Sequence, residues 1–309
     1  MSLIFIGEAM LELRGTNDAA HLGYGGDVLN TAIHLARLGH HVKLATALGA
    51  DPYSNQMKLK WQAAGVDTEL VLVDPERLPG LYAIHTDSHG ERQFFYWRQV
   101  SAAKRMHQLE GVHQIESAVK NSSGLYFSLI SLAILPEEGR EWLCHLASEL
   151  KARGKTVVFD GNYRPKLWES LESARHWRDR GIAVSTLGLP TLADEQLLDN
   201  QSNRQSVAEH WNRLGCGEVV VKLGDQGCQI QSGALVSTLP ITSIRDTSGA
   251  GDAFNAGYWH ARLMGRSEPQ SALSGHALAG WVITQSGAIP EATTEAPYKR
   301  LQNTPRSIA

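Results

Sequence analysis

The stretch DTSGAGDAFN at residues 246–255 joins a glycine-rich loop to the start of a helical pattern. One face of that helix carries Ala250, Phe254, Gly257, Ala261 and Met264, and Gly265 can end it. A helix N-terminus offers unbonded N–H groups and the positive end of the helix dipole, so this loop favours an anion. Asp252 makes sense beside an anion if its carboxylate takes a proton from a hydroxyl that attacks a phosphate held there. In isolation, a Gly-x-Gly-Asp motif is more often a plain loop followed by an acid that complements the helix dipole. The rest of the chain must therefore decide between this interpretation and an anion site with a general base.

Composition and charge describe an ordinary globular protein with a slightly acidic balance. The chain has 309 residues, 42% of them hydrophobic, and a formal net charge of −3. This length slightly exceeds the usual size of a domain with a single hydrophobic core, so we expect one large domain with a small appendage. The charge argues against a general nucleic-acid binder, and no apolar run is long enough for a membrane span. The N-terminus lacks the features of a signal peptide, and three scattered cysteines indicate reduced thiols, so we expect a cytoplasmic protein.

Predicted strands and helices alternate over most of the chain. Strands are expected at residues 3–6, 42–48, 125–130, 156–159, 182–186 and 218–223. Helices are expected at 29–38, 56–64, 138–151, 250–264 and 270–285. Repeated strand–helix units with short loops predict a mainly parallel sheet with helices on both faces and right-handed crossovers. The tail after about residue 291 is expected to be frayed.

Between residues 66 and 98 the rhythm changes to strands without helices. Extended stretches are expected at 66–73, 81–87 and 91–98, with a tight connection at residues 88–90. We interpret residues 10–24 and 66–99 as a small β-sheet lid on a main α/β domain formed by 1–9, 25–65 and 100–309. Tyr82, Tyr96 and Arg98 could then point at a ligand held by the glycine loop, although the tyrosines could equally pack under the lid.

A second glycine-rich loop, GYGGD at residues 23–27, also leads into a helix. In the simplest interpretation it is a plain turn in which Asp27 is the N-cap. Alternatively, Gly26 allows close approach of a small ligand, and Asp27 and Asn30 bond to its hydroxyl groups.

The strand at 156–159 is followed by polar residues that include Asn162 and Arg164. Ligands of open α/β sheets gather at the carboxyl ends of the strands, so these side chains are candidates for ligand contact. Arg98 and Arg164 offer the planar, two-pronged donors that suit a carboxylate.

Three motifs together resemble the ribokinase-type (PfkB) carbohydrate kinase family. They are GGD with Asn30 at residues 25–30, KLGDQG at 222–227 and DTSGAGD at 246–252, in the family's order and spacing over nearly the full chain. The stretches RLPGLY (77–82), GERQFFYWR (90–98) and FDGNYRPKLW (159–168) are similar to the bacterial 2-keto-3-deoxygluconate kinases within that family. The resemblance implies a ribokinase-like α/β domain with a β lid, ATP and Mg²⁺ as cofactors, and phosphorylation of a sugar hydroxyl.

The resemblance also implies roles for individual residues. Asp252 would be the general base, with the amides of Gly249, Ala250 and Gly251 as an anion hole. The sugar acid would contact Gly26, Asp27, Asn30, Tyr82, Tyr96, Arg98, Asn162 and Arg164. The nucleotide would contact Lys222, Gly224, Gly227, Gly249, Gly251 and Asn255. The family often has Asn-x-x-Glu where Thr191-Leu-Ala-Asp194 stands here, so Asp194 would support Mg²⁺ through water and the role of Thr191 stays open.

The predicted reaction is transfer of a phosphoryl group from ATP to the C6 hydroxyl of 2-keto-3-deoxy-D-gluconate, giving 2-keto-3-deoxy-6-phosphogluconate. A kinase for a neutral sugar such as fructose or ribose is the alternative enzyme, although it would leave Arg98 and Arg164 as unpaired buried cations. A non-catalytic sugar-acid-binding protein is the alternative from another class. The expected partners are the sugar acid and ATP, without nucleic acid or membrane, and the lid edges suggest a homodimer. Activation by a monovalent cation follows from the resemblance alone, and the preferred epimer, gluconate- or galactonate-derived, is open.

Overall fold

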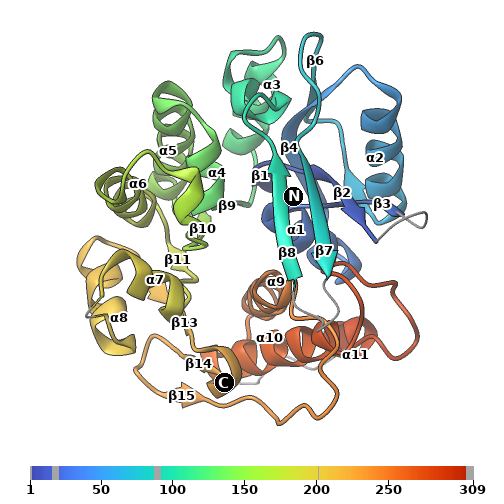
Figure 1. The fold of residues 1–309 in the computed structure, drawn as a ribbon. Coiled ribbons are helices and arrows are strands. Elements are labelled where there is room, and N and C mark those ends of the chain that lie inside the picture. Colours follow the sequence, from blue (N-terminus) through green and yellow to red (C-terminus); the bar gives the residue numbers. More distant parts are fainter. Residues whose placement is uncertain (1, 16–20, 87–91, 201, 304–309) are drawn as a thin grey trace.

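The computed structural model describes residues 2–15, 21–86, 92–200 and 202–303 (Figure 1). An eight-stranded sheet forms its centre, with the order β12-β11-β10-β9-β1-β4-β5 and with β6 beside β4. These strands are β1 (Leu3–Ile6), β4 (Val42–Gly49), β5 (Val66–Asp67), β6 (Val71–Asp74), β9 (Gly124–Ser128), β10 (Thr156–Asp160), β11 (Leu187–Gly188) and β12 (Glu218–Val219). Their pairings are parallel, which confirms the predicted architecture.

Helices cover both faces of this sheet. Ile4 and Ile6 of β1 belong to one buried cluster, and Leu3 and Phe5 belong to the other, because successive strand residues point to opposite faces. The first cluster receives residues from α3 (Val112–Lys120), α4 (Leu129–Ile134), α5 (Glu137–Ala152), α6 (Leu171–Ala183), α7 (Leu192–Leu198) and α8 (Arg204–Arg213). The second receives residues from α1 (Asp27–Arg37), α2 (Pro52–Ala63), α9 (Ala250–Leu263), α10 (Glu268–Ile283) and α11 (Tyr298–Asn303).

A separate four-stranded sheet, called the small sheet below, has the order β3-β2-β7-β8. It consists of β2 (Met10–Arg14), β3 (His21–Gly25), β7 (Leu81–Thr86) and β8 (Arg92–Trp97). The antiparallel strands β7 and β8 lie side by side across the front of Figure 1. A third sheet contains β13 (Val221–Lys222), β14 (Cys228–Gln229) and β15 (Leu235–Val236). Short 3-10 helices occupy Ala102–Gln108 (η2), Pro165–Leu167 (η3) and Gly224–Gln226 (η4).

The structure corrects the predicted boundary of the small sheet. Residues 66–74 pair in parallel with β4 as β5 and β6, so they extend the central sheet and the predicted lid was wrong there. A strand run without helices looks the same in sequence whichever sheet it joins, because pairing is decided by distant partners. The predicted connection at residues 88–90 lies outside the described residues.

Three further predictions about secondary structure were wrong. The strand expected at 182–186 is reduced to β11, because α6 continues to Ala183 and buries Ile182. The strand expected at 125–130 ends at Ser128, whose hydroxyl accepts the N–H of Ser131 and caps α4. Within the tail expected to fray, Tyr298–Asn303 instead form α11, whose Tyr298 and Leu301 are buried in the core. The rest of that tail, residues 304–309, lies outside the described residues. In the described part of the chain, no helix is long and apolar enough to cross a membrane.

Candidate active site

The glycine loop before α9 has a conformation that requires glycine. Gly249, the N-cap of α9, has a φ of +72°, and a Cβ there would lie 2.5 Å from the Cβ of Ala288. The buried carboxylate of Asp246 accepts the N–H of Ser248 at 2.9 Å and the N–H of Gly287 at 2.7 Å. These contacts fix the loop, and with it the start of α9, against the segment that follows α10.

The first turn of α9 supplies the amides of the predicted anion hole. Amides in this turn have no acceptor four residues earlier in the helix, and the helix dipole adds positive potential. The N–H of Ala250 donates to the carbonyl of Thr247 at 3.3 Å, so this amide already has a partner. Gly249 and Gly251 are therefore the better candidates for anion contact.

Asp252 lies in the same turn and is buried, with 8% of its surface exposed. Its Oδ2 accepts a 2.8 Å hydrogen bond from Nδ2 of Asn30 in α1. Burial raises the pKa of Asp252 to about 8, and the negative charges of Asp27 and Asp160 add to this effect, whereas the Asn30 bond and Lys222 oppose it. A carboxylate that holds its proton this tightly has a basicity suited to removing a proton near neutral pH.

A lysine and two polar side chains complete the buried cluster beside Asp252. Nζ of Lys222 lies 2.9 Å from Oδ1 of Asp160 and donates to Oδ1 of Asn255 at 3.1 Å. Nδ2 of Asn255 donates to the hydroxyl of Tyr126 at 2.9 Å. The cluster thus joins α9 to β9, β10 and β13, and the ammonium of Lys222 balances part of the surrounding negative charge.

The N-terminus of α1 meets the end of β10 at the same edge of the sheet. Nδ2 of Asn162 donates to Oδ2 of Asp27 at 3.2 Å. Burial raises the pKa of Asp27, the charge of Asp160 acts in the same direction, and Arg98 opposes it. Gly26 immediately precedes Asp27 as the N-cap of α1. The residues expected to bind sugar hydroxyls therefore lie beside the candidate base, as the position of strand ends predicts.

The aromatic candidates of the small sheet lie on paired strands. Tyr82 of β7 is directly opposite Tyr96 of β8, and their ring centroids are 6.1 Å apart. The hydroxyl of Tyr82 donates a short hydrogen bond to Glu12 of β2, and Tyr82 is nearly buried. Tyr96 is 44% exposed, so it has surface left for a ligand.

Arg98, one residue beyond β8, differs from its predicted state. Its guanidinium is buried and forms a close ion pair with the buried carboxylate of Glu8, and it lies 6.0 Å from the ring of Tyr96. The objection that a neutral substrate would leave Arg98 unpaired is therefore wrong, because Glu8 already balances its charge.

Arg164 follows β10 and pairs with an acid of α7. Its side chain is 51% exposed, and Nη1 lies 3.4 Å from Oδ1 of Asp194 at the start of α7. Burial raises the pKa of Asp194, and the positive charges of Arg164 and Lys222 lower it. Because Arg164 is half exposed, its charge is available to an anionic ligand at little desolvation cost.

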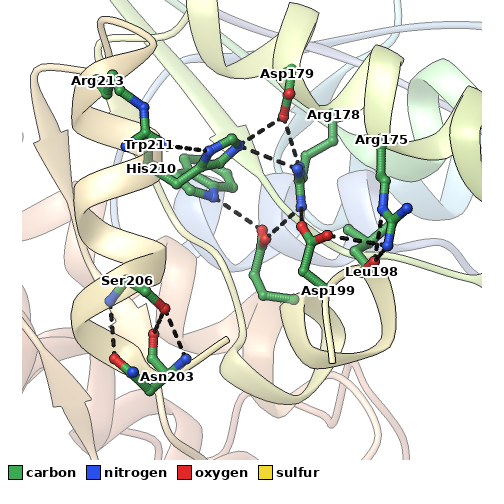
Figure 2. A network of polar contacts seen from close by, with 11 residues as sticks. Arg175, Arg178, Asp179, Leu198, Asp199, Asn203, Ser206, His210, Trp211 and Arg213 are labelled. Atoms are coloured by element: carbon green, nitrogen blue, oxygen red, sulfur yellow. Dashed lines mark hydrogen bonds and ion pairs between the residues drawn. The ribbon is translucent and has the colours of Figure 1, made fainter. Parts of the chain in front are cut away.

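A network around the buried Arg178 and Glu195 holds the helix that carries Asp194 (Figure 2). Nη1 of Arg178 in α6 donates to Oε2 of Glu195 at 3.1 Å and to Oδ2 of Asp199 at 2.9 Å. Nε1 of Trp211 in α8 donates to Oε1 of Glu195 at 3.0 Å. Both carboxylate oxygens of Glu195 are thereby bonded to neighbouring helices. This fixes α7, and hence the position of Asp194 one residue earlier.

The predicted nucleotide residues follow β13. Lys222 ends that strand, and Gly224 and Gly227 flank the tight turn that contains η4. The ammonium of Lys222 points into the buried cluster through its contacts with Asp160 and Asn255. This lysine thus connects the turn to β10 and to α9.

Several residues that complete the site were missed from the sequence. Asp160 ends an apolar strand, and a lone acid at a strand end is a signal that could have identified it. Tyr126 lies within an apolar strand and gave no such signal. Glu8 and Glu12 fall in a stretch of mixed composition, and only the tertiary structure shows that they meet Arg98 and Tyr82.

The chain is similar to known carbohydrate kinases in sequence and in fold. A family model described as pfkB family carbohydrate kinase matches residues 2–295. The chain is 41% identical over 294 residues to the 2-dehydro-3-deoxygluconokinase of Escherichia coli K12, covering 92% of this chain and 95% of that protein. It is 39% identical over 297 residues to the Haemophilus influenzae protein of the same name, covering 93% and 95%. The crystal structure of 2-dehydro-3-deoxygluconokinase from Thermotoga maritima has the same fold, with a TM-score of 0.84, 21% identity and coverage of 98% and 100%.

Proposed function

The chain belongs to the pfkB family of carbohydrate kinases, and on that premise we propose that it phosphorylates the C6 hydroxyl of 2-keto-3-deoxy-D-gluconate with ATP. This compound is also called 2-dehydro-3-deoxygluconate, the name carried by the relatives that are about 40% identical. The observation that carries the proposal is the buried Asp252, with its raised pKa, in the first turn of α9 directly after the glycine loop. The product is 2-keto-3-deoxy-6-phosphogluconate.

Asp252 acts as the general base of the reaction. It takes the proton of the C6 hydroxyl while that oxygen bonds to the γ-phosphorus, and the bond from phosphorus to the β,γ-bridging oxygen breaks to release ADP. The amides at 249–251 stabilise negative charge on the transferred group, with Ala250 contributing less because it has a turn partner. The pKa near 8 supports this role, since a base of ordinary aspartate basicity would remove the proton less effectively.

The sugar acid lies between the small sheet and the ends of the central strands. Asp27 and Asn30 bond to hydroxyl groups, with Asn162 holding Asp27 in place and Gly26 allowing close approach. Tyr82 and Tyr96 contact the hydroxyl or keto oxygens from the small sheet. The substrate carboxylate meets Arg164, whose exposed guanidinium is the better partner, and Arg98 contributes from its pair with Glu8.

ATP lies along the turn after β13, with Gly224 and Gly227 facing its phosphates and with Lys222 and Asn255 acting from the buried cluster behind them. Mg²⁺ neutralises the phosphate charge when it is bound. Among the described residues, no group of three or more His, Cys, Asp or Glu side chains forms a metal cage. Mg²⁺ would therefore be held mainly by the ATP phosphates and by water. Asp194 would contact the ion indirectly, through one of those water molecules.

Three finer properties belong to the same proposal. A homodimer through the small sheet is supported by the exposed side chains of Phe94, Phe95, Tyr96 and Trp97. Light scattering of the purified protein tests it, and a monomer at micromolar concentration would contradict it. Activation by a monovalent cation follows from family resemblance, and turnover that is equal in potassium and in tetramethylammonium buffers would exclude it. A cytoplasmic location is supported by the three buried, free cysteines, and recovery of the protein in a cell fraction other than the cytoplasm would contradict it.

The proposed reaction is tested by a coupled ADP-release assay. The substrates are 2-keto-3-deoxygluconate, its galactonate-derived epimer, fructose and ribose, each with ATP and Mg²⁺. We expect the highest kcat/KM for one of the two sugar acids. Preference for fructose or ribose would replace the proposal by the neutral-sugar alternative, and sugar-acid binding without ADP release would favour the non-catalytic alternative.

A further inference from the structure

A line of polar contacts runs from the small sheet to the glycine loop. The hydroxyl of Tyr82 donates to Glu12, and Glu12 forms a close ion pair with Arg14 on the same strand. Nη1 of Arg14 lies 3.9 Å from Oδ2 of Asp246. Asp246 in turn accepts the N–H of Ser248, next to Gly249. Five side chains or amides thus connect a candidate sugar contact to the candidate phosphate site.

Burial makes these charges sensitive to one another. The side chains of Glu12 and Asp246 are 8% and 2% exposed, whereas that of Arg14 is 28% exposed. Two buried carboxylates share this one guanidinium, and charges interact more strongly where water is excluded. A change in the position of one carboxylate therefore changes the balance of forces on the other.

Arg14 also lies against the glycine that follows α10, in a space that any larger side chain there would need. Gly287 has a φ of +85°, and a Cβ on it would lie 2.7 Å from Nη1 of Arg14. The N–H of Gly287 is the second donor to Asp246. Arg14 therefore pairs with the acceptor of this hydrogen bond and lies next to its donor residue, so its movement would shift the segment on which Gly249 packs.

We propose that Arg14 is a positioning residue that couples occupation of the sugar site to the geometry of the phosphate-binding loop. The inference depends on the proposed function. A substrate oxygen that contacts Tyr82 changes the hydrogen bond between Tyr82 and Glu12, and Arg14 transmits the change to Asp246 and the loop. Sugar and nucleotide then favour the same arrangement, so each increases the affinity for the other by the same factor.

Calorimetry measures this coupling directly. The Kd of 2-keto-3-deoxygluconate is determined with and without a saturating, non-hydrolysable ATP analogue and Mg²⁺. We expect the analogue to lower the Kd about 5–10-fold in the wild type, and less than about 2-fold in Arg14→Gln. Glu12→Gln removes the preceding charge in the line and should give the same loss, so the test does not depend on one variant folding.

Arg105→Gln is the matched control. Arg105 is 26% exposed and pairs with the fully buried Asp74 at 3.0 Å, so it resembles Arg14 in exposure and pairing, but the pair joins η2 to β6. It should retain the wild-type coupling. Coupling retained in Arg14→Gln, or lost equally in Arg105→Gln, would overturn the inference. If the wild type does not bind 2-keto-3-deoxygluconate, the substrate proposal fails, and the coupling is measured with the sugar that the enzyme phosphorylates.

Discussion

Replacement of Asp252 by asparagine distinguishes a catalytic base from an acid that merely complements the helix dipole. The substitution keeps the size of the side chain and an acceptor for Asn30, but it removes the charge and the ability to take a proton. Because a positioned base contributes about 10²–10⁴-fold to a rate, we expect kcat to fall by that factor. The Kd values of both substrates should change little, since the shape of the site is kept.

The same substitution should also stabilise the protein. The pKa of Asp252 rises from 3.8 to about 8 on folding, so the folded state holds this proton more tightly than the unfolded chain. Stability is therefore lost as pH rises from 3.8 toward 8, and the deficit at pH 7 is about 4 kcal/mol, at about 1.4 kcal/mol per pKa unit. An amide still needs hydrogen-bond partners, so we expect Asp252→Asn to recover about 1–2 kcal/mol and to raise Tm by a few degrees.

Kinetics and thermal unfolding at pH 7 measure the two effects. The matched control is Glu268→Gln, which removes an acid from the first turn of α10 rather than α9. That variant should keep its kcat and lose about 0.3–1 kcal/mol of stability. The kcat/KM of the wild type should rise with pH to a plateau above about pH 8, and this rise should be absent in Asp252→Asn. A kcat close to the wild-type value, or a Tm lowered as in the control, would refute the assignment.

The remaining predictions concern the neighbours of this group. Arg164→Ala should raise the KM for the sugar acid far more than the KM for ATP, and equal increases would argue against a carboxylate contact. Glu195→Gln should lower the free energy of unfolding by about 1–3 kcal/mol, because Arg178 stays buried with fewer countercharges; an unchanged denaturation midpoint would exclude this network as the anchor of α7. Gly249→Ala should cost about 1–3 kcal/mol and reduce kcat, because its Cβ meets Ala288 in a left-handed conformation. Unimpaired turnover in that variant would mean that the loop need not keep its position.

Local sequence patterns were sufficient where the structure depends on neighbouring residues. The helix after Gly249 was predicted at 250–264 and is observed at Ala250–Leu263, because its apolar face has the helical period and Gly265 follows it. The parallel sheet followed from repeated strand–helix units. Patterns failed at 66–74 and 182–186, where the outcome depended on which distant strand paired and on how far a buried helix continued.

The sequence alone determined the glycine loop, the acid at Asp252 and the α/β frame around them, because each depends on residues within a few positions of one another. Only the tertiary structure decided that Asn30 bonds to Asp252 across 222 positions, that Lys222 pairs with Asp160 across 62, and that Glu8 neutralises Arg98. Such contacts are set by how the sheet orders its strands, and no local pattern encodes that order. The raised pKa of Asp252 is likewise a property that only the tertiary structure decided, since burial by residues from several strands and helices produces it.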